Sequence, residues 1–72
     1  MKEKLIKLWE RKEGYIENFT ELKFRETFLS QAFGALEMAM AMADNWEQEA
    51  ELVNLWNDEW KARLEAKVYE MR

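Results

Sequence analysis

The sequence predicts an all-α protein: an antiparallel up-down-up bundle of three helices, completed by self-association. Proline is absent and glycine occurs only at positions 14 and 34, so few residues interrupt a helix. Apolar residues recur at the spacing of an amphipathic helix in three stretches, and the short connections between them make successive helices antiparallel. We expect one domain over residues 1–72, with helices at about 2–17, 21–43 and 46–70.

The first helix is predicted from a single apolar stripe. Gly14 falls on the opposite, polar side of that stripe, where it is either tolerated at a cost of about 1 kcal/mol against alanine or marks a helix end. After the stripe the apolar side reverses, which a straight helix cannot do, so we expect a turn with Asn18 or Thr20 as the next N-cap. The stripe consists of Leu5, Leu8, Trp9, Ile16 and Phe19.

The second helix carries apolar residues around an unusually wide arc. Alanine and methionine alternate from Met38 to Ala43, as in a strand, but both are strong helix formers and no β-branched residue accompanies them. The arc covers roughly 220° of the helical wheel, whereas a helix packed on one side needs somewhat over 100°. One ridge, here called the methionine ridge, consists of Phe24, Phe28, Ala35, Met38 and Met42. A second ridge consists of Leu22, Leu29, Phe33, Leu36 and Met40, with Ala32, Ala39 and Ala43 between the two.

Two interpretations of this arc stay open. In the first, the two neighbouring helices leave one ridge uncovered and the methionine ridge meets another chain, because methionine packs adaptably at interfaces. Alternatively, the second helix is central and is gripped between its neighbours. We favour the first interpretation and expect a homo-oligomer, most simply a dimer with a two-fold interface.

The third helix has the clearest start. Asp44 and Asn45 are both good N-caps, and Glu47 and Gln48 follow them at the spacing of a capping box. A kink at Asn57 and the next residue, both cap formers, is an open alternative. The expected apolar stripe consists of Trp46, Ala50, Val53, Trp56, Trp60, Leu64, Val68 and Met71.

Composition excludes several kinds of chemistry. The chain has no cysteine and no histidine, so it cannot form a disulfide, a thiol redox centre, a Ser-His-Asp triad or a histidine-bearing zinc or di-iron site. The sequence contains no glycine-rich phosphate loop and no EF-hand spacing. We therefore expect no enzymatic activity, no cofactor and no metal.

Charge is unevenly distributed. Residues 1–43 carry seven basic and seven acidic side chains, and residues 44–72 carry four and eight. Complementarity to the dipole of the third helix explains this pattern; the functional alternative is a docking patch that imitates nucleic-acid phosphates. The bases of the first helix alternate with acids, so no direct nucleic-acid binding is expected. The candidate acidic docking patch consists of Asp44, Glu47, Glu51, Asp58 and Glu59.

No targeting segment is expected. Charges interrupt every apolar stretch of KEKLIKLWERK, where a signal peptide needs an unbroken one. The stretch TFLSQAFGAL is too short and too polar to span a bilayer. These features predict a cytoplasmic protein without membrane contact.

Two segments, SQAFGALEMAM and LWNDEWKARLEAKVYE, carry a resemblance over about residues 30–70. They resemble short helical proteins encoded by phages and prophages of Gram-positive bacteria. The resemblance implies an intracellular phage product that binds a host protein, and it implies no activity and no site residue. The leading hypothesis is a non-enzymatic, self-associating protein-interaction module. The alternatives are an acidic inhibitor of a nucleic-acid-handling protein and a small-ligand binder that uses the tryptophans of the third helix.

Overall fold

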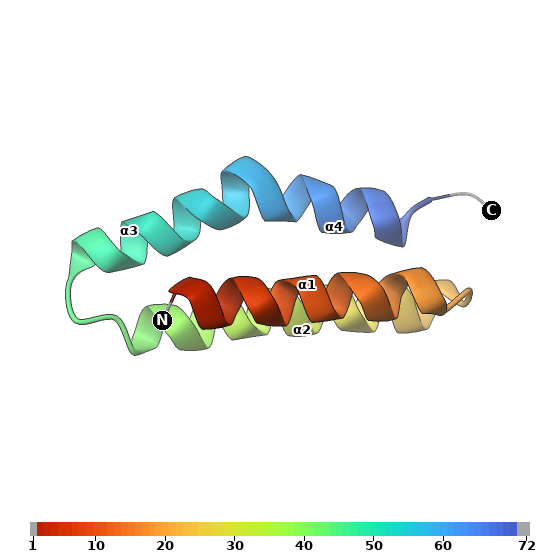
Figure 1. The fold of residues 1–72 in the computed structure, drawn as a ribbon, viewed down its shortest axis with the longest axis horizontal. Helices are drawn as coiled ribbons and strands as arrows, with labels where there is room; N and C mark the ends of the chain where they lie inside the picture. Colours follow the sequence, from red (N-terminus) through yellow and green to blue (C-terminus); the bar gives the residue numbers. More distant parts are fainter. Residues whose placement is uncertain (1, 71–72) are drawn as a thin grey trace.

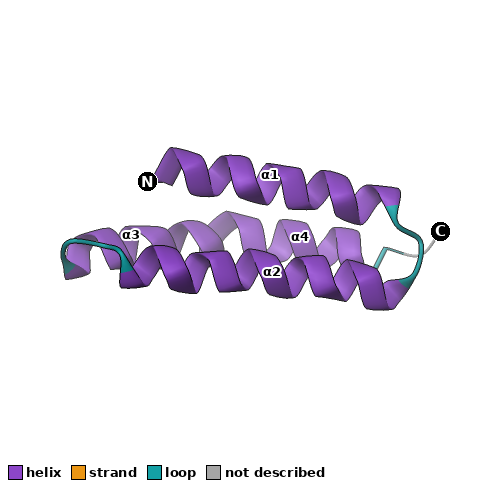
Figure 2. Cartoon of the chain, turned by 90° about the horizontal axis from the view of Figure 1, so that it is seen from below, coloured by secondary structure: helices purple, strands orange, loops and turns teal. Residues whose placement is uncertain are grey.

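The computed structural model describes residues 2–70 and confirms the all-α bundle. Helices α1 (Lys2–Asn18) and α2 (Leu22–Ala41) form an antiparallel pair. The third helix consists of α3 (Trp46–Leu55), a π-helical turn η1 (Trp56–Trp60) and α4 (Lys61–Val68). This third helix lies along one side of the α1/α2 pair (Figure 1), and Figure 2 views the pair with the third helix behind it. The bundle is elongated, with extents of 41 × 18 × 17 Å.

Gly14, the start of α2 and the start of α3 were the candidate helix boundaries, and a side-chain cap sets only the last of them. α1 continues through Gly14, and a Cβ built there meets no atom within 4 Å, so glycine is not required at this position. The N-cap of α2 is Glu21 and not Asn18 or Thr20 as predicted; it makes no side-chain capping hydrogen bond, so the turn and not a cap sets this boundary. The N-cap of α3 is Asn45 as expected, and its side-chain oxygen accepts a hydrogen bond of 2.9 Å from a backbone N–H in the first turn.

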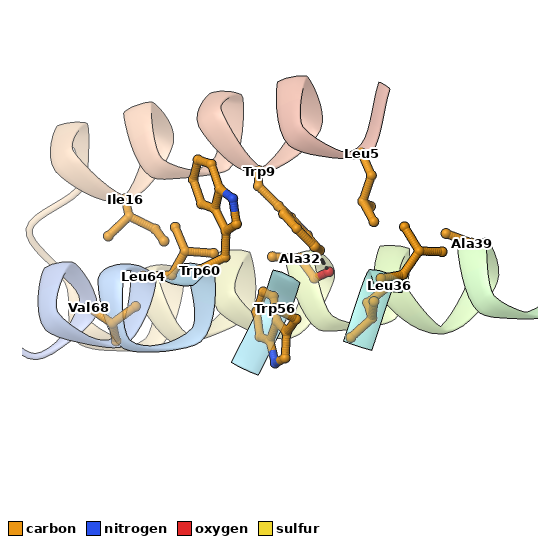
Figure 3. Packing of buried hydrophobic residues seen from close by; sticks show 11 residues of the cluster. Leu5, Trp9, Ile16, Ala32, Leu36, Ala39, Trp56, Trp60, Leu64 and Val68 are labelled. Carbon is orange, nitrogen blue, oxygen red and sulfur yellow. Dashed lines mark hydrogen bonds between the residues drawn. The ribbon is translucent and has the colours of Figure 1, made fainter. Parts of the chain in front are cut away.

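Trp9 lies at the centre of the core (Figure 3). It is fully buried, and its indole Nε1 donates a hydrogen bond of 3.0 Å to the backbone carbonyl of Ala32 on α2. The rings of Trp56 and Trp60 lie against it, with centroids 5.2 and 5.7 Å away. A buried tryptophan needs a partner for its N–H, and the small side chain of Ala32 leaves the α2 backbone accessible to it. One side chain thus joins all three helices.

The third helix changes geometry where it meets Trp9. In an α-helix a step of four residues turns the side chain by about 400°, so residues four apart drift by roughly 40° per step. A π turn is wider and offsets part of this drift, which keeps Trp56 and Trp60 on the side of the core. The π turn includes Asn57 and Asp58, the two residues at which a kink was given as an alternative from the sequence. The buried residues of the third helix are spaced by four throughout: Leu52, Trp56, Trp60, Leu64 and Val68.

The apolar stripe predicted for the third helix is therefore correct only in its second half. Trp46 was expected in the core and is 73% exposed. Leu52 is buried, whereas the predicted core residues Ala50 and Val53 are only half-buried. The prediction assumed a uniform α-helix, and the π turn shifts the phase of the residues before it. Met71 lies outside the described residues.

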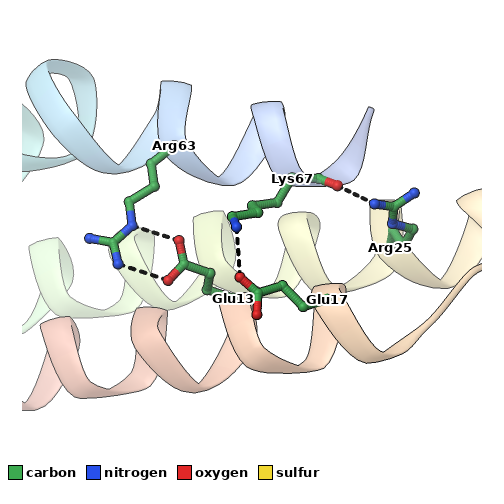
Figure 4. A network of polar contacts seen from close by, with 5 residues as sticks. All are labelled: Glu13, Glu17, Arg25, Arg63 and Lys67. Atoms are coloured by element: carbon green, nitrogen blue, oxygen red, sulfur yellow. Dashed lines mark hydrogen bonds and ion pairs between the residues drawn. The ribbon is translucent and has the colours of Figure 1, made fainter. Parts of the chain in front are cut away.

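Arg25 is a buried charged residue that the sequence analysis did not single out. Its guanidinium donates a hydrogen bond to the backbone carbonyl of Lys67 in the last turn of α4 (Figure 4). It donates another, of 3.3 Å, to the backbone carbonyl of Glu70 just after the helix. The last carbonyls of a helix lack intrahelical partners and form the negative end of its dipole. The guanidinium of Arg25 gives these carbonyls hydrogen-bond donors and places a positive charge at the negative end of the dipole. It thereby fixes the end of the third helix on α2.

Replacing Trp9 by phenylalanine removes the indole N–H but keeps an aromatic ring. We expect Trp9→Phe to lower the free energy of unfolding by about 2–4 kcal/mol, because a buried hydrogen bond and ring packing are lost together. Trp46→Phe makes the same chemical change at an exposed site and should alter that free energy by less than about 0.5 kcal/mol. Urea unfolding followed by far-UV circular dichroism measures both variants. Equal losses would contradict a special role for Trp9.

Candidate functional site

The side of the α1/α2 pair that points away from the third helix carries large exposed apolar side chains. No segment of residues 2–70 covers this side, which we call the α1/α2 face (Figures 1 and 2). It includes the methionine ridge, in which Met38 is 69% exposed, Met42 is 67% exposed and Phe24 is exposed. The other two members of the ridge, Phe28 and Ala35, are half-buried and pack against the core. The described part of the chain thus leaves this ridge largely uncovered.

An apolar groove of about 510 Å³ occupies one end of the α1/α2 face. Leu5 of α1 and Ala39 of α2 are buried, so they form its floor. Its walls carry Met38 and Met42, whose unbranched side chains adapt to different partners. The lining residues are Lys4, Leu5, Leu8, Ala35, Met38, Ala39 and Met42.

Four aromatic residues form the other end of the same face. Tyr15 and Phe19 come from the end of α1 and the residue after it, and Phe24 and Phe28 come from the start of α2. The ring centroids of Tyr15 and Phe28 are 5.4 Å apart, and those of Phe19 lie 5.3 Å from Phe28 and 5.7 Å from Phe24. Phe19 was predicted to be in the core, but the chain leaves the helix before it and it is 43% exposed. We call these residues the aromatic cluster.

Lys12 separates the apolar groove from the aromatic cluster. Its Nζ donates a hydrogen bond of 2.7 Å to Oε1 of Gln31 across the two helices. The same ammonium lies 5.5 Å from the ring centroid of Tyr15 and 5.9 Å from that of Phe28, within the range of cation–π attraction. The α1/α2 face therefore has two apolar ends and a polar, positively charged centre.

The glutamates of α1 that form ion pairs face the third helix instead. Glu13 accepts two hydrogen bonds from Arg63, at 2.6 and 2.8 Å, and Glu17 pairs with Lys67 at 2.8 Å (Figure 4). The hydrogen bond to Glu13 raises the pKa of Arg63. These ion pairs engage two basic residues of α4 and fix the orientation of α1. The basic residues on the other side of α1 therefore point away from the third helix.

The charged residues that border the α1/α2 face are basic. Lys4 lines the groove, and Arg11 follows it on the same side of α1 at a spacing of seven residues. Among the described residues, neither of them nor Lys12 forms an ion pair. Along the sequence these bases alternate with acids, but helical geometry separates the two kinds of charge. The spacing Lys4, Leu8, Arg11, Tyr15 was the signal that would have revealed this edge.

The predicted acidic docking patch lies apart from this face. Its five residues are exposed, on the connection before α3, on α3 and on η1. Glu51 is already engaged, since it pairs with Lys2 of α1 at 3.1 Å. In residues 2–70, no group of three or more acidic side chains is placed to hold a metal ion. Trp56 and Trp60 are buried in the core, so they do not line a ligand pocket.

Alkaline pH should loosen the contacts that the C-terminal end of the third helix makes with α1 and α2. The hydrogen bond to Glu17 raises the pKa of Lys67 above its ordinary 10.5, and the charge of Glu26 raises the pKa of Tyr69 above its ordinary 10.0. In both cases folding favours the protonated form. The resulting stabilisation is complete below the ordinary pKa values and is lost as pH rises through the raised ones.

We therefore expect the melting temperature to fall between about pH 9 and about pH 12. Lys67→Met removes the titrating ammonium and leaves Tyr69, so its melting temperature should fall less steeply over the same range. Thermal melts followed by circular dichroism at a series of pH values measure both proteins. Parallel curves would show that the pair of Lys67 with Glu17 contributes nothing to the pH dependence.

The chain matches no known protein family, no curated protein and no solved structure. Of the helices in the described part of the chain, none is long and apolar enough to cross a bilayer. The α1/α2 face is therefore interpreted from its own geometry and chemistry.

Proposed function

We propose that this protein is a non-enzymatic protein-interaction module that binds a helix of another protein chain on its α1/α2 face. The observation that carries this proposal is the exposure of Met38 and Met42 beside an apolar groove, in a domain whose core is closed without them. Soluble monomers rarely expose large contiguous apolar patches without a use for them. Methionine and aromatic side chains, which form both ends of this face, are enriched at protein interfaces.

A helix of the partner protein fits this face better than a flat partner surface would. The groove lies between two antiparallel helices, and the opposite side of the same pair already accommodates a helix, the third one of the bundle. A bound amphipathic helix would place apolar residues at i, i+4 and i+7 into such a groove. The face extends from Phe24 to Met42, 19 residues, which is about 27 Å of helix at 1.5 Å for each of the 18 steps. A helix of five turns matches this length.

Self-association through the methionine ridge, expected from the sequence, stays a prediction. A dimer with a two-fold axis would bring the α1/α2 faces of two copies together. Both faces carry Lys4, Arg11 and Lys12, so like charges would share the interface, which opposes association. We therefore rank a different protein before a second copy as the partner.

Selection from a library of helix-forming peptides tests the proposal. We expect it to yield binders whose affinity falls at least tenfold for the double variant Met38→Asp and Met42→Asp, because two charges would be buried against the peptide. Both side chains are about two-thirds exposed in the free chain, so helicity and melting temperature should stay near those of the original chain.

The matched control is Ala62→Asp with Ala66→Asp, which adds the same charges at exposed positions of α4, on the opposite side of the α1/α2 pair. It should leave peptide affinity unchanged. Isothermal titration calorimetry measures all three proteins. If no peptide binds, or if binders tolerate the methionine variants, the α1/α2 face is not an interaction site.

A further inference from the structure

We infer that the partner bound on the α1/α2 face is an amphipathic helix with acidic side chains along the edge that faces α1. This inference rests on the proposed function and adds the chemistry of the partner. It is carried by the contrast between the whole chain, with a net charge of −4, and this face, which is bordered by basic residues. Complementary charge at the edge of an apolar contact selects partners and speeds association.

Acidic and basic side chains lie on different sides of α1. The pairs with Arg63 and Lys67 hold Glu13 and Glu17 against the third helix. Lys4 and Arg11 are left exposed at the edge of the α1/α2 face, and no described acidic residue pairs with them. Across the face, the Lys23 ammonium lies 3.8 Å from the carboxylate of Glu21 and 5.3 Å from the ring centroid of Phe24. An acidic partner would supply the missing counter-charges.

The spacing of Lys4 and Arg11 matches that of residues on a helix lying beside α1. Lys4 and Arg11 are seven residues apart, two helical turns, or about 10.5 Å along the axis. A helix lying parallel or antiparallel to α1 presents residues i and i+7 at the same separation. Acidic residues at i and i+7 would therefore face both bases while the apolar stripe between them enters the groove.

Other occupants fit the face less well. A nucleic acid would place phosphates beside Met38 and Met42, and only a few basic side chains are available to neutralise the phosphate charges. An anionic membrane prefers a convex helix surface, whereas this end of the face is hollowed into a groove of about 510 Å³. A second copy bound head to tail through its acidic residues would form a ring or an open chain, and either would appear as an oligomer in sedimentation.

Three designed peptides of about 18 residues test the inference. They share one apolar stripe and carry glutamate, glutamine or lysine at the two edge positions i and i+7. We expect the glutamate peptide to bind about tenfold more tightly than the glutamine peptide, and the lysine peptide to bind most weakly. The preference should shrink in 1 M salt, where the Debye length is about 3 Å.

Charge reversal gives the sharpest test. The double variant Lys4→Glu with Arg11→Glu should invert the preference, binding the lysine peptide more tightly than the glutamate peptide. The control Lys61→Glu with Ala62→Asp and Ala66→Asp makes the same change in net charge at exposed positions of α4, on the opposite side of the α1/α2 pair, and should keep the original order. Circular dichroism verifies that both variants remain folded.

The outcomes separate the two proposals. If all three peptides bind equally, the face binds helices but the acidic partner is overturned. If none binds, both proposals fail. A duplex oligonucleotide or phosphatidylserine vesicles that bind more tightly than the glutamate peptide, with loss in the Lys4 and Arg11 variant, would assign the face to a nucleic acid or a membrane. Sedimentation of the free chain as oligomers would assign it to a second copy.

Discussion

The buried side chain of Trp9 is the constraint on which the rest of the bundle depends. Its hydrogen bond to the carbonyl of Ala32 fixes α1 on α2, and its contacts with Trp56 and Trp60 fix the third helix on both. The π turn exists where two tryptophans of one helix must meet the same ring. Because a small residue of α2 receives Trp9, the larger apolar residues of α2 remain outside this contact.

This arrangement explains why a chain of 72 residues leaves apolar surface exposed. The third helix can cover only one side of the α1/α2 pair, and its ion pairs with Glu13 and Glu17 hold it there. The opposite side keeps Met38 and Met42 exposed, and at its edge it keeps Lys4 and Arg11, which form no ion pair within residues 2–70. Core packing and charge pairing on one side thus define an apolar, basic surface on the other.

Much of the fold could be predicted from periodicity, because three amphipathic stretches and the Asn45 cap are local signals. Which residues of the third helix face the core could not be predicted in this way, since a π turn has no residue signature. The turn moves Leu52 into the core and Trp46 out of it. Arg25 was missed because an arginine within an apolar arc is normally exposed, and only the tertiary fold brings it to the end of α4. The methionine ridge was visible in the sequence, and the spacing of Lys4 and Arg11 was a signal for the basic edge. Which side of α1 faces the third helix depends on the ion pairs of Glu13 and Glu17, which only the tertiary fold shows.

The exposure of the methionine methyl groups in the free chain tests the account most directly. A soluble gadolinium chelate broadens the NMR signals of exposed methyl groups in a protein labelled at its methionines. The account predicts strong broadening for Met38 and Met42 and weaker broadening for the half-buried Met40, unchanged on dilution. Protection of Met38 and Met42 equal to that of Met40 at every concentration would show that the chain covers this face itself, and would contradict the account.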